Sequence, residues 1–255
     1  MLIKGKVCLI TGGGSGIGEV AAWRFAEEGA RVIIADIDEN AGKSVAAQVR
    51  SAYGTEAAIA IRADVSDEQE VQSLAVAIAS QCGKLDVLLN NAATILPKRL
   101  EEVETAEWSR MMDINLKSVF LLIKYMIPML RQSKGSIVNM GSLNGLIGQK
   151  NNAVYASTKG AIVAMTKSLA LDYAPDGVRV NCICPAGVST PLLEQWIAEQ
   201  QDPAHARLML DEMHPLGRPA KPSEIADAAL FFASSLSQFV TGVALPVDGG
   251  ASLGY

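Results

Sequence analysis

The sequence is poor in the residues that metal centres and nucleic-acid surfaces require. Only two histidines and four cysteines occur among 255 residues, and no two cysteines form a CxxC pair, so no metal site is expected. Lys and Arg number 22 against 27 Asp and Glu, the formal net charge is −5, and no basic run is present. The sequence therefore gives no support to nucleic-acid binding.

Long apolar runs are missing as well. The N-terminal stretch MLIKGKVCLITGGG has too short an apolar run for a signal-peptide core, and no segment approaches the roughly 20 apolar residues of a membrane span. We therefore expect no membrane association and a cytoplasmic location. The cysteines are expected to be free thiols, mostly buried: Cys8, Cys82, Cys182 and Cys184.

The composition is otherwise that of a globular protein. Hydrophobic residues make up 49% of the chain and charged residues 19%, and 255 residues suit one large α/β domain with a substantial core. Short apolar runs typical of buried strands alternate with longer amphipathic segments. This alternation predicts a parallel sheet covered by helices on both faces, with right-handed crossovers.

The pattern gives residue ranges for these elements. The expected strands cover residues 6–11, 31–36, 57–64, 85–91, 135–141, 178–184 and 242–248. The expected helices cover residues 17–28, 39–52, 67–81, 113–132, 153–174 and 222–233. Gly29 is placed to cap the end of the first helix, and Asp38 to cap the start of the second.

One segment, residues 186–221, interrupts the alternation. It holds no strand pattern but contains four prolines, both histidines and a helical stretch. An insertion of this size in an α/β domain is usually functional. We expect it to form a helical lid over a substrate, within a single domain that covers residues 1–255.

A glycine-rich stretch, TGGGSGIG at residues 11–18, follows the first expected strand and opens the first expected helix. At such a position backbone N–H groups and a helix N-terminus can hold a pyrophosphate. The glycines fit Thr11-Gly12-x-x-x-Gly16-x-Gly18, not G-x-G-x-x-G. A plain tight turn is the alternative, but five glycines in eight residues exceed its needs. The predicted cofactor contacts here are Gly12, Gly14, Ser15, Gly16, Ile17 and Gly18.

Asp36 ends the second expected strand, about 20 residues after the glycines. A carboxylate at this place can accept hydrogen bonds from an adenosine ribose, whereas the alternative is a solvated loop aspartate. Ile37 follows it, and no Arg or Lys stands ready to meet a 2′-phosphate. The sequence therefore favours NAD over NADP, with Asp36 and Ile37 as cofactor contacts.

The stretch VYASTKG, residues 154–160, places Tyr155 and Lys159 one helical turn apart, on one face of a helix. The pair can be a surface feature. It can also move a proton, because a nearby cation favours the phenolate of a tyrosine, whose ordinary pKa is about 10. Ser142 follows an expected strand, where open α/β sheets place their sites; a loop or cap serine is the alternative.

Taken together, these motifs resemble those of the short-chain dehydrogenase/reductase family, in order and over nearly the whole chain. The matching pieces are TGGGSGIG at 11–18, ADV at 63–65, NNA at 90–92, Asn115, Ser142, YASTK at 155–159, VRVNCICP at 178–185, Thr190 and VTGVALPVDGG at 240–250. The resemblance implies a doubly wound, Rossmann-like sheet of seven parallel strands that binds a nicotinamide dinucleotide.

The resemblance also implies a catalytic group of Asn115, Ser142, Tyr155 and Lys159. In this group Tyr155 exchanges a proton with the substrate, Ser142 orients the substrate oxygen, and Asn115 holds a water that links Lys159 to solvent. Lys159 also reaches the nicotinamide ribose. Further cofactor contacts implied by the family are Asp64, Val65, Asn91, Ala92, Ala93, Tyr155, Lys159, Pro185, Val188 and Thr190.

Some implications concern assembly and departures from the family pattern. The family commonly forms tetramers through its two long helices, here 113–132 and 153–174, and Tyr255 could reach a neighbouring subunit. Ala93 and Ala186 stand where the family usually has glycine, so that an added methyl group could narrow the pocket.

Residues expected to face the substrate are rich in amides. The predicted contacts are Ser142, Asn144, Gln149, Asn152, Tyr155 and Gly187. The amides suggest a hydroxylated substrate such as a sugar, sugar acid or polyol, although Asn is also common in turns. The lid adds the apolar residues Leu192, Leu193, Trp196, Met209 and Met213. His205 and His214 could touch substrate, but a lone histidine in a polar helix usually faces solvent.

The leading hypothesis is an NAD-dependent oxidoreductase that interconverts a secondary alcohol and a ketone on a small polyhydroxylated substrate. One alternative keeps the chemistry but takes a 3-oxoacyl thioester on a carrier protein. Another alternative, of a different class, is a dinucleotide-binding sensor or scaffold without catalysis; the presence of Tyr155, Lys159 and Ser142 counts against it.

Overall fold

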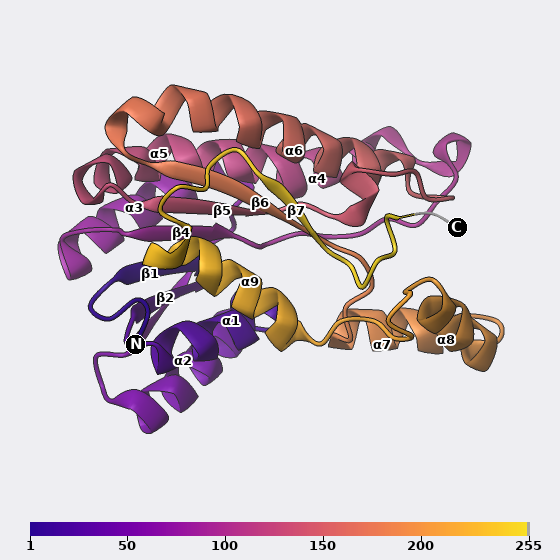
Figure 1. Ribbon diagram of the computed structural model, residues 1–255, viewed down its shortest axis with the longest axis horizontal. Helices are drawn as coiled ribbons and strands as arrows, with labels where there is room; N and C mark the ends of the chain where they lie inside the picture. The colour runs from indigo at the N-terminus through magenta and orange to yellow at the C-terminus, as the bar shows by residue number, and fades with distance from the viewer. Residues whose placement is uncertain (254–255) are drawn as a thin grey trace.

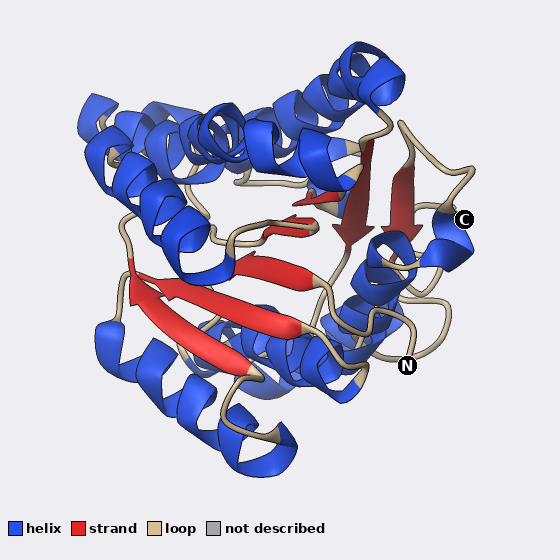
Figure 2. Ribbon diagram, turned by 90° about the vertical axis from the view of Figure 1, so that its left-hand side faces the viewer, coloured by secondary structure: helices blue, strands red, loops and turns tan. Residues whose placement is uncertain are grey.

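The computed structural model describes residues 1–253, so that Tyr255 and its expected subunit contact lie outside the described residues. Within residues 1–253 the chain forms one seven-stranded sheet, whose order is β3-β2-β1-β4-β5-β6-β7 (Figures 1 and 2). Every pair of neighbouring strands is parallel. The strands are β1 (Val7–Thr11), β2 (Arg31–Asp36), β3 (Ala58–Arg62), β4 (Val87–Asn90), β5 (Ser136–Met140), β6 (Arg179–Pro185) and β7 (Ala244–Val247).

The helices between the strands differ in number from the expected ones. They are α1 (Gly16–Glu27), α2 (Glu39–Tyr53), α3 (Glu68–Cys82), α4 (Thr105–Met112), α5 (Ser118–Ser133), α6 (Ala153–Tyr173), α7 (Pro191–Ala198), α8 (Pro203–Glu212) and α9 (Pro222–Ala233). The predicted doubly wound fold and the order of its elements are confirmed, and most observed ends lie within a few residues of the predicted ones.

Helices cover both faces of the sheet (Figure 1), and a hydrophobic layer lies between the sheet and the helices on each face. Successive residues of a strand point to opposite faces, and in β1 Ile10 belongs to the layer that α1, α2 and α9 cover, whereas Leu9 belongs to the layer that α3, α5 and α6 cover. Both side chains are fully buried. The strands are therefore apolar on both sides, as a sheet covered on both faces requires.

The strand order reverses at β1, which pairs with β2 on one side and with β4 on the other. At this point the chain leaves the sheet in opposite directions, so that a crevice opens at the carboxyl ends of β1 and β4. The predicted cofactor turn follows β1 immediately. The topology thus fixes where a ligand can enter.

The expected single helix over residues 113–132 is wrong. The helical run starts earlier, at α4, passes through one π turn at Asp113–Lys117 and continues as α5. Glu104 and Glu107 form a capping box at the start of α4. Helix α4 is short and mostly polar. The apolar pattern that predicted a helix from residue 113 therefore does not extend over it.

The predicted helix caps are close to the observed ones. The Asp38 carboxylate accepts hydrogen bonds from the backbone N–H groups of Asn40 and Ala41, as expected of an N-cap. Helix α1 has Glu28 as its C-cap, and Gly29 follows one residue later with φ +84°. Gly29 therefore occupies the left-handed position just beyond the cap, where glycine is favoured.

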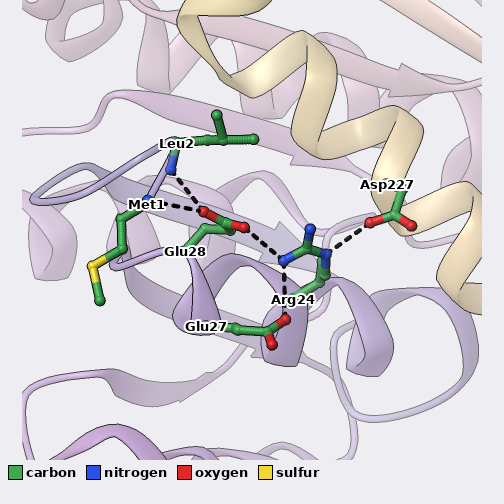
Figure 3. Close-up of polar contacts among 6 residues, drawn as sticks. All are labelled: Met1, Leu2, Arg24, Glu27, Glu28 and Asp227. Carbon is green, nitrogen blue, oxygen red and sulfur yellow. Dashed lines mark hydrogen bonds and ion pairs between the residues drawn. The ribbon is translucent and has the colours of Figure 1, made fainter.

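Charged side chains fasten α1 to α9 and to the N-terminus (Figure 3). Arg24 donates from Nε to Asp227 at 2.7 Å and from Nη1 to Glu28 at 2.9 Å. Glu28 in turn accepts from the backbone N–H of Leu2 at 2.7 Å. Because these groups are partly solvated, they contribute modestly to stability. They nevertheless attach α1, whose N-terminus faces the crevice, to α9 and to the N-terminal segment.

In the described part of the chain, no helix combines the length and the apolar character needed to cross a membrane.

Candidate functional site

A cleft of about 2090 Å³ runs along the carboxyl ends of the central strands and continues beneath α7 and α8. Most of the residues predicted to bind cofactor or substrate line this cleft. They are Gly12, Ser15, Gly16, Ile17, Asp36, Ile37, Asp64, Val65, Asn91, Ala92, Ala93, Ser142, Asn144, Gln149, Asn152, Tyr155, Lys159, Pro185, Gly187, Val188 and Thr190. Gly14, Gly18 and Asn115 are not among the lining residues; each lies behind the wall of the cleft, in contacts described below.

The turn after β1 requires glycine for two different reasons: a left-handed backbone at some positions and close packing at another. Gly12 and Gly16 have φ +63° and +57°, in the left-handed region. Gly18 lies behind the turn, where an added Cβ would be 2.1 Å from the Gly12 carbonyl oxygen. The turn therefore folds tightly onto the start of α1 and leaves its backbone open to the cleft, as a phosphate cradle requires.

Asn91, just beyond β4, locks this turn to the opposite side of the crevice. Its amide nitrogen donates to the carbonyl oxygens of Thr11 at 2.9 Å and Gly12 at 3.2 Å. The Thr11 hydroxyl accepts from the backbone N–H groups of Asn91 at 3.0 Å and Ala92 at 3.1 Å. Four hydrogen bonds thus fix the distance between the two walls of the cleft.

Asp36 lies at the end of β2 with its carboxylate beside the glycine turn. One oxygen accepts from the backbone N–H of Gly14 at 2.8 Å, and the other accepts from that of Asp38 at 2.9 Å. Gly14 therefore holds Asp36 and does not itself line the cleft. Ile37, beside it, is 57% exposed, so an apolar side chain stands at this end of the cleft.

Asp64 and Val65 form the next part of the wall, after β3. The Asp64 carboxylate accepts from the backbone N–H and the hydroxyl of Ser66. Burial opposes ionisation of Asp64, but these hydrogen bonds and the charges of Arg62 and Arg110 hold the pKa of its carboxyl below the ordinary value.

Tyr155, Ser142 and Lys159 meet at the carboxyl ends of β5 and β6. The Lys159 ammonium is 5.6 Å from the centroid of the Tyr155 ring and donates to the Met140 carbonyl oxygen at 2.8 Å. Lys159 is 2% exposed. Ser142 caps a short turn by accepting from the Asn144 backbone N–H at 3.1 Å. The structure thus brings together three of the four predicted catalytic side chains.

The pKa values of this group differ from the expectation drawn from the sequence. Burial raises the pKa of the Tyr155 phenol above its ordinary value, with the Ser142 hydroxyl acting in the opposite direction. Burial lowers the pKa of Lys159 to about 8. Desolvation therefore disfavours the charged form of both side chains.

Asn115, the fourth predicted residue, lies in the π turn and is 1% exposed. Its side-chain oxygen accepts from the Thr94 backbone N–H at 2.8 Å, and its amide nitrogen donates to the Thr94 carbonyl oxygen at 2.9 Å. A weaker contact of 3.4 Å reaches Thr158. The side chain therefore fastens the loop after β4 to the helix, and its predicted water-holding role stays a prediction.

The substrate end of the cleft carries a cluster of three amides. The Gln149 side-chain oxygen accepts from the amide nitrogens of Asn144 at 2.6 Å and Asn152 at 3.2 Å. Gln149 is exposed. This cluster holds the loop between β5 and α6 in shape and presents amide groups to the cleft.

The predicted lid residues form α7 and α8 and the turns beside them. Leu192, Leu193, Trp196, Met209 and Met213 line the cleft, as do the two alanines that replace the usual glycines, Ala93 and Ala186. The Thr190 side chain caps α7 by accepting from the Leu193 backbone N–H at 3.4 Å. Thr190 thus marks the point where the β6 segment becomes the first helix of the lid.

Sequence reasoning missed several residues that position the site. Gly145 lets the loop after Ser142 lie on α6, because a Cβ there would be 2.8 Å from the Lys159 carbonyl oxygen. The NG pair in SLNG was the available signal. Gly141 likewise lies against Cys182 and Cys184, whose sulfur atoms are 3.9 Å apart.

The two histidines occupy different environments. His205 is exposed on α8, but His214 is 2% exposed and hydrogen-bonded on both ring nitrogens. The expectation of a solvent-facing histidine is therefore wrong for His214. Among residues 1–253, no group of three or more His, Cys, Asp or Glu side chains is placed to hold a metal ion.

Comparisons with known proteins agree on one family. A family model described as "Enoyl-(Acyl carrier protein) reductase" matches residues 12–252. L-fucose dehydrogenase of Mus musculus is 42% identical to this chain, over 99% of this chain and 90% of its own length.

Solved structures are similar over the same extent. Aldohexose dehydrogenase of Thermoplasma acidophilum has a TM-score of 0.89 and 34% identity, over 99% of this chain and 96% of its own. The 3-ketoacyl-(acyl-carrier-protein) reductase from Brucella melitensis, solved with NADH, has a TM-score of 0.88 and 36% identity, over 98% and 99%.

The buried ammonium of Lys159 generates a stability prediction. Because its folded-state pKa of about 8 lies below the ordinary 10.5, the unfolded chain binds more protons between these values, and stability should rise with pH there. Lys159→Met should therefore raise the free energy of unfolding at pH 7 by roughly 1–3 kcal/mol. Denaturant unfolding measured from pH 7 to 10.5 should show this gain fading.

Lys167→Met is the matched control, because Lys167 is exposed on the same helix. Its effect should be small and independent of pH. A Lys159→Met protein that is less stable than the wild type at pH 7, or whose gain grows with pH, would contradict the assignment of a desolvated ammonium.

Proposed function

This chain belongs to the short-chain dehydrogenase/reductase family, and from that premise we propose that it is an NAD-dependent oxidoreductase acting on a small polyhydroxylated compound. The family places it among enzymes that interconvert an alcohol and a ketone with a nicotinamide dinucleotide. A hydroxyl-bearing substrate and the preference for NAD are our proposals. The observation that carries the oxidoreductase proposal is the meeting of Tyr155, Ser142 and Lys159 in the cleft that the glycine turn opens.

The residues of the cleft fit a dinucleotide. The crowding at Gly18 and the left-handed Gly12 leave the backbone of the turn bare for the pyrophosphate. Asp36 would hold the adenosine ribose, and Lys159 the second ribose. When bound, the dinucleotide accepts or supplies the hydride.

Tyr155 would exchange the proton. During oxidation the substrate hydroxyl loses its proton to the Tyr155 oxygen as the carbon gives up its hydride, and reduction reverses both transfers. Ser142 would donate a hydrogen bond to the same substrate oxygen and fix its orientation. Lys159, beside the phenol and partly deprotonated near its pKa of about 8, would favour ionised Tyr155 whenever it carries its charge.

The proposal of a hydroxylated substrate rests on the amide cluster and on the relatives. Asn144, Gln149 and Asn152 present donors and acceptors to the same end of the cleft as Tyr155, and such groups suit several neighbouring hydroxyls. The two relatives named for sugars, L-fucose dehydrogenase and aldohexose dehydrogenase, support the same class.

A second candidate is reduction of a 3-oxoacyl thioester on a carrier protein. The description of the matching family model and the similarity to the Brucella melitensis reductase favour it. Its substrate would need an apolar path for the acyl chain, which Leu192, Trp196 and Met209 could supply. The two candidates share the hydride-transfer chemistry and differ in substrate, and the thioester candidate also favours NADPH and a basic surface for the carrier protein.

Turnover assays test the proposal. The wild-type enzyme should reduce NAD with at least one member of a panel of aldoses, polyols and sugar acids, followed at the absorbance of NADH. Tyr155→Phe should lower kcat by at least 10³-fold, because the proton acceptor is lost, with NADH affinity changed less than threefold. Acetoacetyl thioesters with NADH and NADPH form the second arm of the panel.

The outcomes separate the candidates. Turnover of thioesters but of no polyol would replace the proposed substrate class with the second candidate. A Tyr155→Phe enzyme within tenfold of wild-type kcat would refute the role of the phenol. Tyr173→Phe is the matched control, since Tyr173 ends the same helix and does not line the cleft.

Asp36 generates a prediction about cofactor choice. A carboxylate at the ribose repels a 2′-phosphate, so Asp36→Asn should lower the ratio of kcat/KM for NAD to that for NADP at least tenfold. The asparagine keeps an oxygen that can accept from Gly14. Asp38→Asn removes the same charge two residues away, outside the cleft, and should change the ratio less than twofold. An enzyme that prefers NADP before any substitution would overturn this assignment.

We also propose that the protein assembles into a homo-oligomer, a tetramer by analogy with the family. Apolar side chains are exposed on both long helices: Phe120 on α5 is 52% exposed and Leu171 on α6 is 78% exposed. A partner helix pair would cover them and gain free energy from their burial.

Size measurement tests the assembly. The wild-type chain of 26.9 kDa should elute as a tetramer, and the double substitution Phe120→Glu with Leu171→Glu should shift it to a smaller species by introducing buried, unpaired charges. Val76→Glu on α3, where Val76 is 65% exposed, is the control and should leave the mass unchanged. A monomeric wild type would exclude the proposed assembly.

A further inference from the structure

Helix α8 is weakly attached to the rest of the protein. None of its ten residues, all of which are described, is buried, and with α7 it projects from the end of the sheet (Figure 1). Yet Met209 of α8 and Met213 just after it line the cleft. The way in which the end of α8 is anchored therefore decides how this side of the cleft is closed.

His214 forms that anchor, two residues beyond the helix. Its imidazole is 2% exposed. The Nδ1 atom lies 2.6 Å from the Leu210 carbonyl oxygen of α8, and the Nε2 atom lies 3.2 Å from the backbone nitrogen of Gly187, just beyond β6. The side chain thus joins two segments that are 23 or more residues apart in sequence.

The two hydrogen bonds require one protonation state. The Gly187 N–H can only donate, so Nε2 must accept, and the ring proton must therefore be on Nδ1, from which it is donated to Leu210. The imidazolium form would place two N–H groups against each other at Gly187. The neutral Nδ1–H tautomer alone satisfies both contacts.

Gly187 is shaped to receive this ring. A Cβ at Gly187 would be 3.0 Å from His214 Cε1, so a larger residue would push the imidazole away. On its other side, Gly187 accepts through its carbonyl oxygen from Ala220 at 2.9 Å, and Ser189 donates to Ala220 at 2.8 Å. His214 and Ala220 thus hold from two sides the segment that leads to the cleft-lining Val188 and Thr190.

We propose that His214 is a positioning residue that couples the lid helix α8 to the cofactor-facing segment Gly187–Thr190 through its Nε2 atom. The inference rests on the proposed function and on the cofactor contacts that the family resemblance implies for Val188 and Thr190. Loss of the Nε2 acceptor loosens this segment and weakens cofactor binding without altering the proton-transfer group at Tyr155.

Two substitutions of similar size separate this role from a purely structural one. His214→Gln places an acceptor near the position of Nε2 but loses the Nδ1 donor, whereas His214→Asn keeps a donor near Nδ1 and loses the acceptor for Gly187. If His214 merely caps α8, His214→Asn should stay closer to the wild type in cofactor affinity and Gly187 exchange. If His214 positions Gly187, His214→Gln should stay closer to the wild type in both.

The measurements are the Kd for NADH by fluorescence, hydrogen exchange of the Gly187-containing peptide, and kcat and KM. For His214→Asn we expect the Kd and the KM for the cofactor to rise roughly fivefold to tenfold and Gly187 exchange to accelerate, with kcat within twofold of wild type. For His214→Gln we expect all values within twofold. His205→Asn, at the exposed histidine of α8, should match the wild type.

Each outcome decides one question. The coupling would be overturned if His214→Asn kept wild-type NADH affinity and Gly187 exchange. It would also be overturned if His214→Gln bound NADH more weakly than His214→Asn. A wild-type protein that neither binds NADH nor turns over any substrate would overturn the proposed function instead, while Gly187 exchange would still report on His214. Thermal unfolding of each variant shows that the comparison is made on folded protein.

Discussion

The parallel direction of all the strands is the constraint on which the rest of this structure depends. Because every strand of the described sheet runs the same way, all their carboxyl ends meet at one edge, and the reversal of order at β1 opens that edge between β1 and β4. Residues as distant in sequence as Gly12, Asp36, Ser142 and Thr190 then line one cleft.

Burial at this edge has an electrostatic cost that the fold bears. Lys159 loses hydration and recovers one hydrogen bond, which it donates to the Met140 carbonyl oxygen, and burial also raises the pKa of the nearby Tyr155 phenol. A binding cleft that excludes water strengthens the interactions of charges that enter it. The unfavourable solvation of these two groups is thus the counterpart of strong interactions with a substrate that enters the cleft.

Features that depend on local sequence could be predicted. The apolar strand runs, the glycine turn and the Tyr155–Lys159 spacing are local patterns, and the structure places these residues where the patterns predict. The hydrogen bonds of Asn91 to Thr11 and of His214 to Gly187 could not be predicted, because they join side chains to backbone groups whose proximity only the finished topology creates. The spacing of Tyr155 and Lys159 shows that a cation is near the phenol but not how deeply both groups are buried, so the effect of burial on the Tyr155 pKa could not be predicted.

The π turn at Asp113–Lys117 sets the angular phase between α4 and α5. A π turn contains one residue more than an α-helical turn, so the side chains on either side of it are rotated by roughly 100° relative to an unbroken helix. That rotation lets Asn115 point inward to Thr94 while α5 keeps its apolar stripe on the sheet. A helix shorter by one residue would keep the same apolar stripe on the sheet but would turn the Asn115 amide away from Thr94, and the loop after β4 would lose this attachment.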